Sequence, residues 1–227
     1  MKHPILKIEE RSPEIYAVSE LLLEEFSRLR LWLFDLEATG LDTASERVTQ
    51  IAGILLADGR IHEDSAFTQF VELEPGVEIP REVQELTGIV PETLAGAPPF
   101  AEAWARHLEA ASSADLWIGQ SVFEFDVPLL LAEFERRGMP AELPGILDSV
   151  VLATHLLGAP ERGERWSTSR LVKHFGADVS GLRRHDALDD VKILGRILEP
   201  MVERIRDVHF DRLDIRDPLP VRRHPPV

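Results

Sequence analysis

The chain has 227 residues, of which 44% are hydrophobic, and this fits a single packed domain with some length left for an arm or a tail. It has no cysteine, which excludes a disulfide framework and thiolate chemistry. The net charge of −15 opposes non-specific binding to a polyanion, so any attraction for nucleic acid must be local. There is no apolar run of the roughly 20 residues that span a membrane and no apolar segment of a signal peptide at the start. We therefore expect a cytoplasmic protein without a membrane partner.

The first third of the chain is predicted to contain one helix and then strands. Apolar residues at helical spacing over 13–29 predict an amphipathic helix within an N-terminal arm, residues 1–30. Apolar runs bounded by turn residues then predict strands at 31–37, 48–57 and 66–73.

Helices dominate the rest of the chain. We predict them at 80–89, 99–112, 125–138, 148–157, 167–175 and 186–207, with one buried strand at 115–119. The proline-rich residues 211–227 are predicted to be a disordered tail. Strands that come early and later alternate with helices indicate one α/β domain with a mixed sheet, residues 31–210.

Two acidic residues end the first predicted strand, LWLFDLEATGLD. Alternate side chains of a strand share a face, so Asp35 and Glu37 lie on one side, about 6–7 Å apart. Two carboxylates at the end of a buried strand repel each other and resist desolvation. Something must neutralise them.

Further acids occur where two later helices begin. Asp126, in the segment FEFDVPLL, is either an N-cap or a member of the same acidic site. The segment RRHDALDD offers His185 and three aspartates, which would also suit the first turn of a helix. Helical periodicity places Asp190, and not Asp189, on the apolar stripe that faces the sheet.

These residues could converge at one edge of the sheet. Oxygen ligands without cysteine suit two divalent cations, Mg²⁺ or Mn²⁺. Two such ions about 4 Å apart would neutralise the carboxylates and clamp a phosphodiester for attack by water. A histidine that titrates near neutrality could take the proton from that water.

The three motifs together resemble those of the DEDDh 3′–5′ exonucleases, the group that contains the proofreading epsilon subunit of DNA polymerase III and ribonuclease T. FDLEATGLD fits the Asp-x-Glu-x-Thr-Gly pattern of the family, FEFDVPLL resembles its second motif, and HDALDD fits His-x-Ala-x-x-Asp. The segments QIAG, LTGI and ILDSVVLA resemble secondary signatures of the family. The resemblance covers roughly residues 30–200.

The resemblance implies a ribonuclease H-like fold, with a five-stranded mixed sheet flanked by helices, and a set of site residues. The implied metal ligands are Asp35, Glu37, Asp126 and Asp190, and the implied general base is His185. The implied reaction releases nucleoside 5′-monophosphates from single-stranded or frayed 3′ ends of DNA, with RNA as the alternative. A DNA polymerase or repair protein is an implied partner.

Substrate contacts are expected from three segments. The resemblance places Thr39, Gly40 and Leu41 near the terminal nucleotide, together with Phe125. The family often has an asparagine at the position of Ser121, and a serine can still hydrogen-bond.

The third segment, 160–185, carries six lysines and arginines against three acids in an otherwise acidic chain. Arg162 and Arg165 are therefore expected to contact the substrate, unless the run is simply a solvated face. Trp166 either stacks on a base or anchors the loop as a partly buried residue.

Two rival functions stay open. A ribonuclease H-type endonuclease also carries acids on its first strand, although the ordered motifs count against it. A non-catalytic module with the same fold would be expected to lack a ligand, and none is lost. DNA and RNA are not distinguished, because recognition of the 2′-hydroxyl depends on the shape of the pocket.

Overall fold

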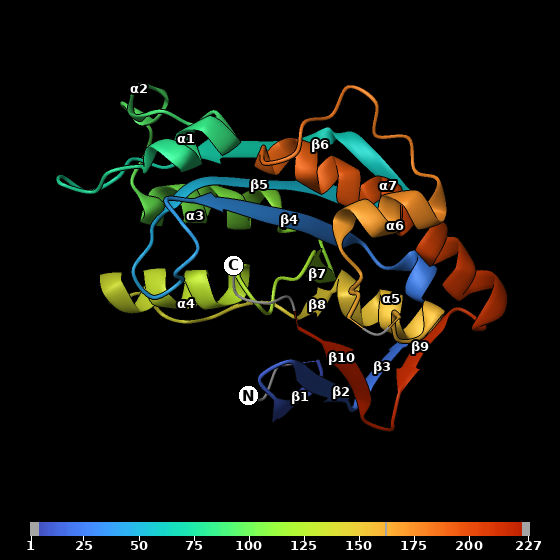
Figure 1. Cartoon of the computed structure of the whole chain (residues 1–227). Coiled ribbons are helices and arrows are strands. Elements are labelled where there is room, and N and C mark those ends of the chain that lie inside the picture. The colour runs from blue at the N-terminus through green and yellow to red at the C-terminus, as the bar shows by residue number, and fades with distance from the viewer. Residues whose placement is uncertain (1–4, 162, 224–227) are drawn as a thin grey trace.

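A computed structural model describes residues 5–161 and 163–223, with a five-stranded mixed sheet at its centre (Figure 1). The strands lie in the order β6-β5-β4-β7-β8, with β4 antiparallel to β5 and parallel to β7. Their bounds are β4 Leu31–Ala38, β5 Val48–Ala57, β6 Arg60–Phe70, β7 Leu116–Gly119 and β8 Ile146–Asp148. The predicted α/β fold with a five-stranded mixed sheet is confirmed.

The helices predicted after residue 80 are all present. They are α1 Arg81–Thr87, α3 Phe100–Ala110, α4 Asp126–Arg137, α5 Ser149–Leu157, α6 Thr168–Phe175 and α7 Ala187–Val208, with the short α2 Pro91–Leu94 in addition. Gly88 and Gly138 end α1 and α4 with φ of 76° and 62°, a left-handed conformation that favours glycine. Within the described residues, no helix combines the length and the apolar character needed to cross a membrane.

The side chains of β4 alternate between two hydrophobic cores. Leu31 and Leu33 belong to a cluster with residues of α5 and α7, whereas Trp32 and Phe34 pack with residues of α3 and α4. Because alternate residues share a face, the end of β4 presents its acids to the α7 side of the sheet.

Helix α7 lies close against the sheet at Gly195. A Cβ at this position would lie 2.4 Å from Cδ1 of Ile61 and 3.3 Å from Cδ1 of Leu33, so a larger residue would push the helix away. This close packing holds the first turn of α7, which carries Asp190, beside the end of β4.

Two strands differ from the prediction. β6 begins at Arg60 and ends at Phe70, so the predicted strand 66–73 covers only its second half. β8, Ile146–Asp148, was not predicted, because it has three residues and runs directly into α5.

The predicted N-terminal helix over 13–29 is wrong. The segment forms strands β2 Ile15–Ser19 and β3 Leu21–Glu24 and the 3₁₀ turn η1 Phe26–Arg28, and β1 Lys7–Ser12 precedes them. Leu22, which should lie on the buried stripe of a helix, is 51% exposed. β2 pairs with β1 and with β10, a strand near the other end of the chain, and the sequence of 13–29 alone does not indicate that distant partner.

The predicted disorder after residue 211 is also wrong for the described part of that segment. β9 Arg212–Ile215 pairs with β3, and β10 Leu219–Arg222 pairs with β2 (Figure 1). Pro220 lacks an N–H donor and is tolerated because β10 is an edge strand. Residues 224–227 of the predicted tail lie outside the described residues.

Candidate active site

Three of the predicted metal ligands meet at the end of β4. Asp35 and Glu37 come from the last residues of β4, and Asp190 comes from the first turn of α7. One carboxylate oxygen from each of the three lies within 4.8 Å of the others. In the part of the chain that the structure describes, this is the only group of acids, histidines or cysteines with such spacing.

Asp126 lies next to this group and does not cap a helix with its side chain. It is the first residue of α4, and its Oδ1 accepts a hydrogen bond from the Leu36 N–H at 3.1 Å. The side chain is buried, and its charge raises the pKa of Asp35. Asp126 therefore lies beside the acidic site, and its interpretation as an N-cap is wrong.

The acidic site is electrostatically unfavourable without a cation. Burial raises the pKa of Asp35 well above its ordinary value, and the Asp126 and Glu37 carboxylates raise it further. Burial and the Asp190 carboxylate likewise raise the pKa of Glu37 to about 8. Burial also raises the pKa of Asp126 and of Asp190.

The donor set fits a divalent cation. Asp190 Oδ1 is buried and forms an ion pair with Arg184, whose Nε lies 2.9 Å away, but it accepts no well-aligned hydrogen bond. Several carboxylate oxygens around one point, with no sulfur ligand, are the coordination that Mg²⁺ and Mn²⁺ prefer.

A test of this charge arrangement needs no nuclease substrate. We expect Asp35→Asn to raise the midpoint of thermal unfolding in metal-free buffer, because the variant removes one member of a repelling cluster. About 1 kcal/mol moves the midpoint of a chain of this size by roughly 2–4 °C. Differential scanning calorimetry with and without Mn²⁺ measures it, and added Mn²⁺ should stabilise the wild type more than the variant. Asp64→Asn, at an exposed position on β6, is the control, and a lower metal-free midpoint for Asp35→Asn would contradict the cluster.

His185 lies in the loop before α7, and its backbone forms a hydrogen bond with Asp190, a candidate metal ligand. Its backbone N–H donates to Asp190 Oδ2 at 2.9 Å, and its φ of 63° is left-handed. Burial and the Arg184 guanidinium lower the pKa of the His185 imidazole, while Asp190 raises it. The net effect favours the neutral imidazole at pH 7, the form that can accept a proton.

The loop around His185 is held by contacts that the sequence did not reveal. The Arg183 N–H donates to Asp189 Oδ2 at 2.9 Å, and its guanidinium donates to the Thr87 carbonyl at the end of α1 at 2.9 Å. Asp186 caps α7 by accepting from the Leu188 and Asp189 N–H groups.

A pocket of about 260 Å³ opens at the acidic site and includes several predicted substrate residues. They are Leu41, Ser121 and Phe125, and the predicted metal ligands Asp35 and Asp190 line the same pocket. Leu41 is 57% exposed, so its side chain is accessible from this pocket. The same pocket is lined by Gln120, Thr168, Arg184 and Leu194. Thr168 was missed because the path of the preceding loop is not visible in the sequence.

Thr39 and Gly40 shape the loop between β4 and β5. Thr39 is buried, and its hydroxyl accepts from the Arg47 N–H at 3.0 Å and donates to the Glu46 carboxylate. A Cβ at Gly40 would lie 2.9 Å from Cδ of Glu46. The Thr39 side chain is thus engaged within the protein, and Leu41 is the member of this motif that lines the pocket.

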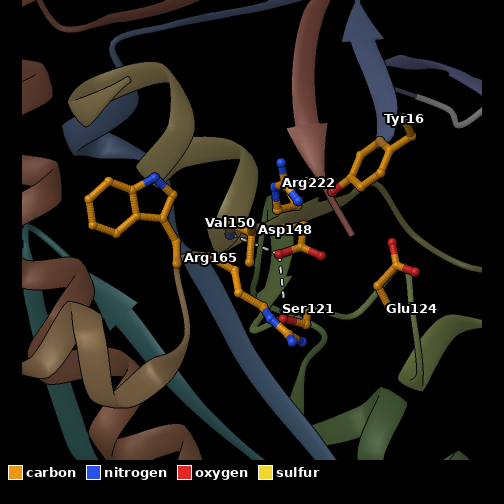
Figure 2. A pocket seen from close by; sticks show the side chains of 8 residues that line it. Tyr16, Ser121, Glu124, Asp148, Val150, Arg165 and Arg222 are labelled. Atoms are coloured by element: carbon orange, nitrogen blue, oxygen red, sulfur yellow. Dashed lines mark hydrogen bonds between the residues drawn. The ribbon is translucent and has the colours of Figure 1, made fainter. Parts of the chain in front are cut away.

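The basic segment 160–185 does not form one open patch. Arg170 pairs with Glu164, and Arg184 lies against Asp190. Arg165 lines a small separate cavity with Ser121 (Figure 2). Arg162 lies outside the described residues.

Trp166 is an anchor, and its predicted stacking on a base is not supported. The side chain is 7% exposed, and its Nε1–H donates to the Gly158 carbonyl at 3.0 Å. Its own carbonyl accepts from Nε2 of Gln120 at 2.8 Å. The ring is therefore packed in the core, where a base cannot reach it without rearrangement.

Comparison with known proteins agrees with this geometry. The family model RNase_T, described as Exonuclease, matches residues 32–198. The chain belongs to the RNase_T exonuclease family. The DNA polymerase III PolC-type protein of Streptococcus thermophilus is 28% identical to this chain over 202 residues. The match covers 89% of the chain but only 13% of the polymerase.

Solved exonucleases share the fold. The nuclease domain of 3′hExo, a DEDDh family member bound to rAMP, gives a TM-score of 0.67 at 16% identity, covering 78% of this chain and 92% of that one. Exonuclease X in complex with 5′ overhanging duplex DNA gives a TM-score of 0.56 at 22% identity, covering 80% of this chain and 96% of that one.

Proposed function

We propose that this exonuclease domain removes nucleoside 5′-monophosphates from single-stranded or frayed 3′ ends of DNA, with the aid of two divalent cations. The observation that carries the proposal is the convergence of Asp35, Glu37 and Asp190, with Asp126 beside them, at the mouth of a pocket. Such acids, buried together, are unfavourable unless they bind cations.

Each residue of the site has a chemical task in this proposal. The four acids hold Mg²⁺ or Mn²⁺, which would neutralise the phosphodiester and stabilise the charge that develops on hydrolysis. His185 accepts the proton of the attacking water at a ring nitrogen. Leu41 and Phe125 pack against the terminal nucleoside and set its distance from the acids.

The acidic character of the chain favours a substrate whose 3′ end enters the pocket. It disfavours a nucleic acid that binds along the surface of the protein. With a net charge of −15, broad electrostatic attraction for a duplex is weak. The relatives leave both nucleic acids open, since one solved relative was bound to duplex DNA and another to rAMP. A polymerase partner is proposed because the PolC-type relative carries its matching region within a DNA polymerase.

The direct test is digestion of matched DNA and RNA oligonucleotides carrying a label at the 3′ or the 5′ end. With Mg²⁺ or Mn²⁺, the 3′ label should appear at once as a mononucleotide, while the 5′-labelled strand shortens stepwise. Internal cleavage as the first event would favour an endonuclease. No cleavage of any substrate with either ion would favour a non-catalytic module.

Metal dependence is a separate prediction. Excess chelator should abolish hydrolysis, because four uncompensated carboxylates repel the phosphate that they must approach. Restoring Mg²⁺ or Mn²⁺ should restore the rate, as measured by release of the 3′ label. Hydrolysis that persists at full rate in excess chelator would contradict the metal mechanism.

A further inference from the structure

The loop 120–125, between β7 and α4, delivers residues to the catalytic pocket. Ser121 and Phe125 line that pocket, and Asp126 follows directly. Ser121 has a φ of 58°, a conformation that costs energy for a residue with a side chain and must be held by its surroundings.

On its inner side the loop is held by Asp148, at the start of α5. This carboxylate is fully buried and accepts from the N–H groups of Ser121 at 3.0 Å and Phe123 at 3.3 Å. It also caps α5 by accepting from Val150 at 2.8 Å (Figure 2).

On its outer side the loop is held by the ends of the chain. Nη1 of Arg223, just after β10, donates to both carboxylate oxygens of Glu124 at 2.8 Å, and its Nη2 donates to Glu10 on β1. The guanidinium lies 5.1 Å from the ring centroid of Tyr16 on β2. We call Glu10, Tyr16 and Arg223 the terminal clasp.

The cavity between Asp148 and the terminal clasp is too small for a ligand. Tyr16, Glu124 and Asp148 lie around one cavity of about 10 Å³, which has room for roughly one water molecule (Figure 2). The polar groups here act on one another and on the loop.

The terminal clasp lies outside the family match, which covers residues 32–198. We propose that the clasp sets the position of loop 120–125, with Arg223 as a positioning residue for substrate binding through Glu124. The inference rests on the proposed function for its kinetic consequence, but its structural part is independent of it.

The clasp is expected to control substrate binding more than the chemical step. Asp126 has its own support, since it lies in α4 and accepts from the Leu36 N–H. Loosening the clasp therefore displaces Ser121 and Phe125, which contact substrate in this proposal, while the metal ligand stays in place.

The test combines Arg223→Ala, Glu124→Gln and the double variant. Each single variant should raise KM for a 3′-labelled single strand about fivefold, within the range for residues of one hydrogen-bond network, with kcat and Mn²⁺ affinity nearly unchanged. The double variant should be no worse than either single one, because both break the same ion pair. Hydrogen exchange should speed up at the loop amides, including those of Ser121 and Phe123.

The control is Arg216→Ala, which removes an exposed arginine of the same terminal segment that pairs only with Asp214 among the described residues. A fall in thermal stability with unchanged KM and unchanged loop exchange would overturn the proposal, and so would additive effects in the double variant. A wild type without nuclease activity would refute the proposed function, and the exchange measurement would still decide the clasp.

Discussion

Asp190→Asn is expected to lose nearly all nuclease activity, whereas Asp189→Asn, at the neighbouring position, should retain most of it. Asp190 contributes one oxygen to the group formed with Asp35 and Glu37, and Arg184 is the cation paired with its Oδ1. The asparagine can still accept from the His185 N–H but lacks the charge that holds a cation.

The size of this loss can be bounded. A hydrogen-bond partner of a metal ligand is typically worth about 10–100-fold in activity or metal affinity, so loss of the ligand itself should exceed that. Single-turnover release of a 3′ label measures the rate, and calorimetric titration with Mn²⁺ measures the affinity.

Asp189 is the matched control because it has the same charge on the same turn of α7. Its Oδ2 accepts from the Arg183 N–H, which an asparagine oxygen can also do. We expect a loss of at most about 0.3–1 kcal/mol of stability from the weaker interaction with the helix N-terminus. The opposite ranking of the two variants would mean that Asp190 is not a ligand.

The convergence of the three acids was predictable because its signals are local. Alternation along β4 is enough to place Asp35 and Glu37 on one face, and the helical period is enough to separate Asp190 from Asp189. The structure brings these three acids together as those two patterns indicate. The role of each residue as a ligand or a base stays a prediction.

The ends of the chain were not predictable in the same way. The apolar residues of 13–29 fit a helix when they are considered alone, but β2 is stabilised by β10, whose residues lie near the other terminus. Glu20 and Glu25 adopt positive φ, which interrupts a helix, and glutamate gives no warning of this in a sequence.

Loop contacts were also hidden. In the sequence, Asp148 is recognisable only as an aspartate that precedes a helix. In the structure, its carboxylate accepts hydrogen bonds from two backbone N–H groups of a loop that is distant in sequence. Trp166 has two plausible environments, exposed or buried, and the fold of its loop decides between them. The environments of Asp148 and Trp166 depend on how segments that are distant in sequence pack together, and the periodicity of the sequence does not predict that packing.

His185→Ala is expected to lower kcat by about 10²–10⁴, the usual contribution of a general base. Metal affinity should stay close to that of the wild type, because His185 does not belong to the group of residues whose ligand atoms meet at the site. Since His185 occupies a left-handed backbone position, His185→Asn is the second variant: asparagine tolerates that conformation but cannot act as a base.

The pH dependence gives an independent measurement. Burial and Arg184 lower the pKa of His185 below its ordinary 6.5, so the imidazole is charged only at acidic pH. The wild-type rate should therefore rise with pH through a midpoint below 6.5 and then level off, whereas both variants should lack this rise. His62→Ala is the control, since pairing with Leu55 places His62 at the Trp32 end of the sheet, away from Glu37. Should His185→Asn keep the wild-type rate and the same acidic limb, another group must take the proton from water.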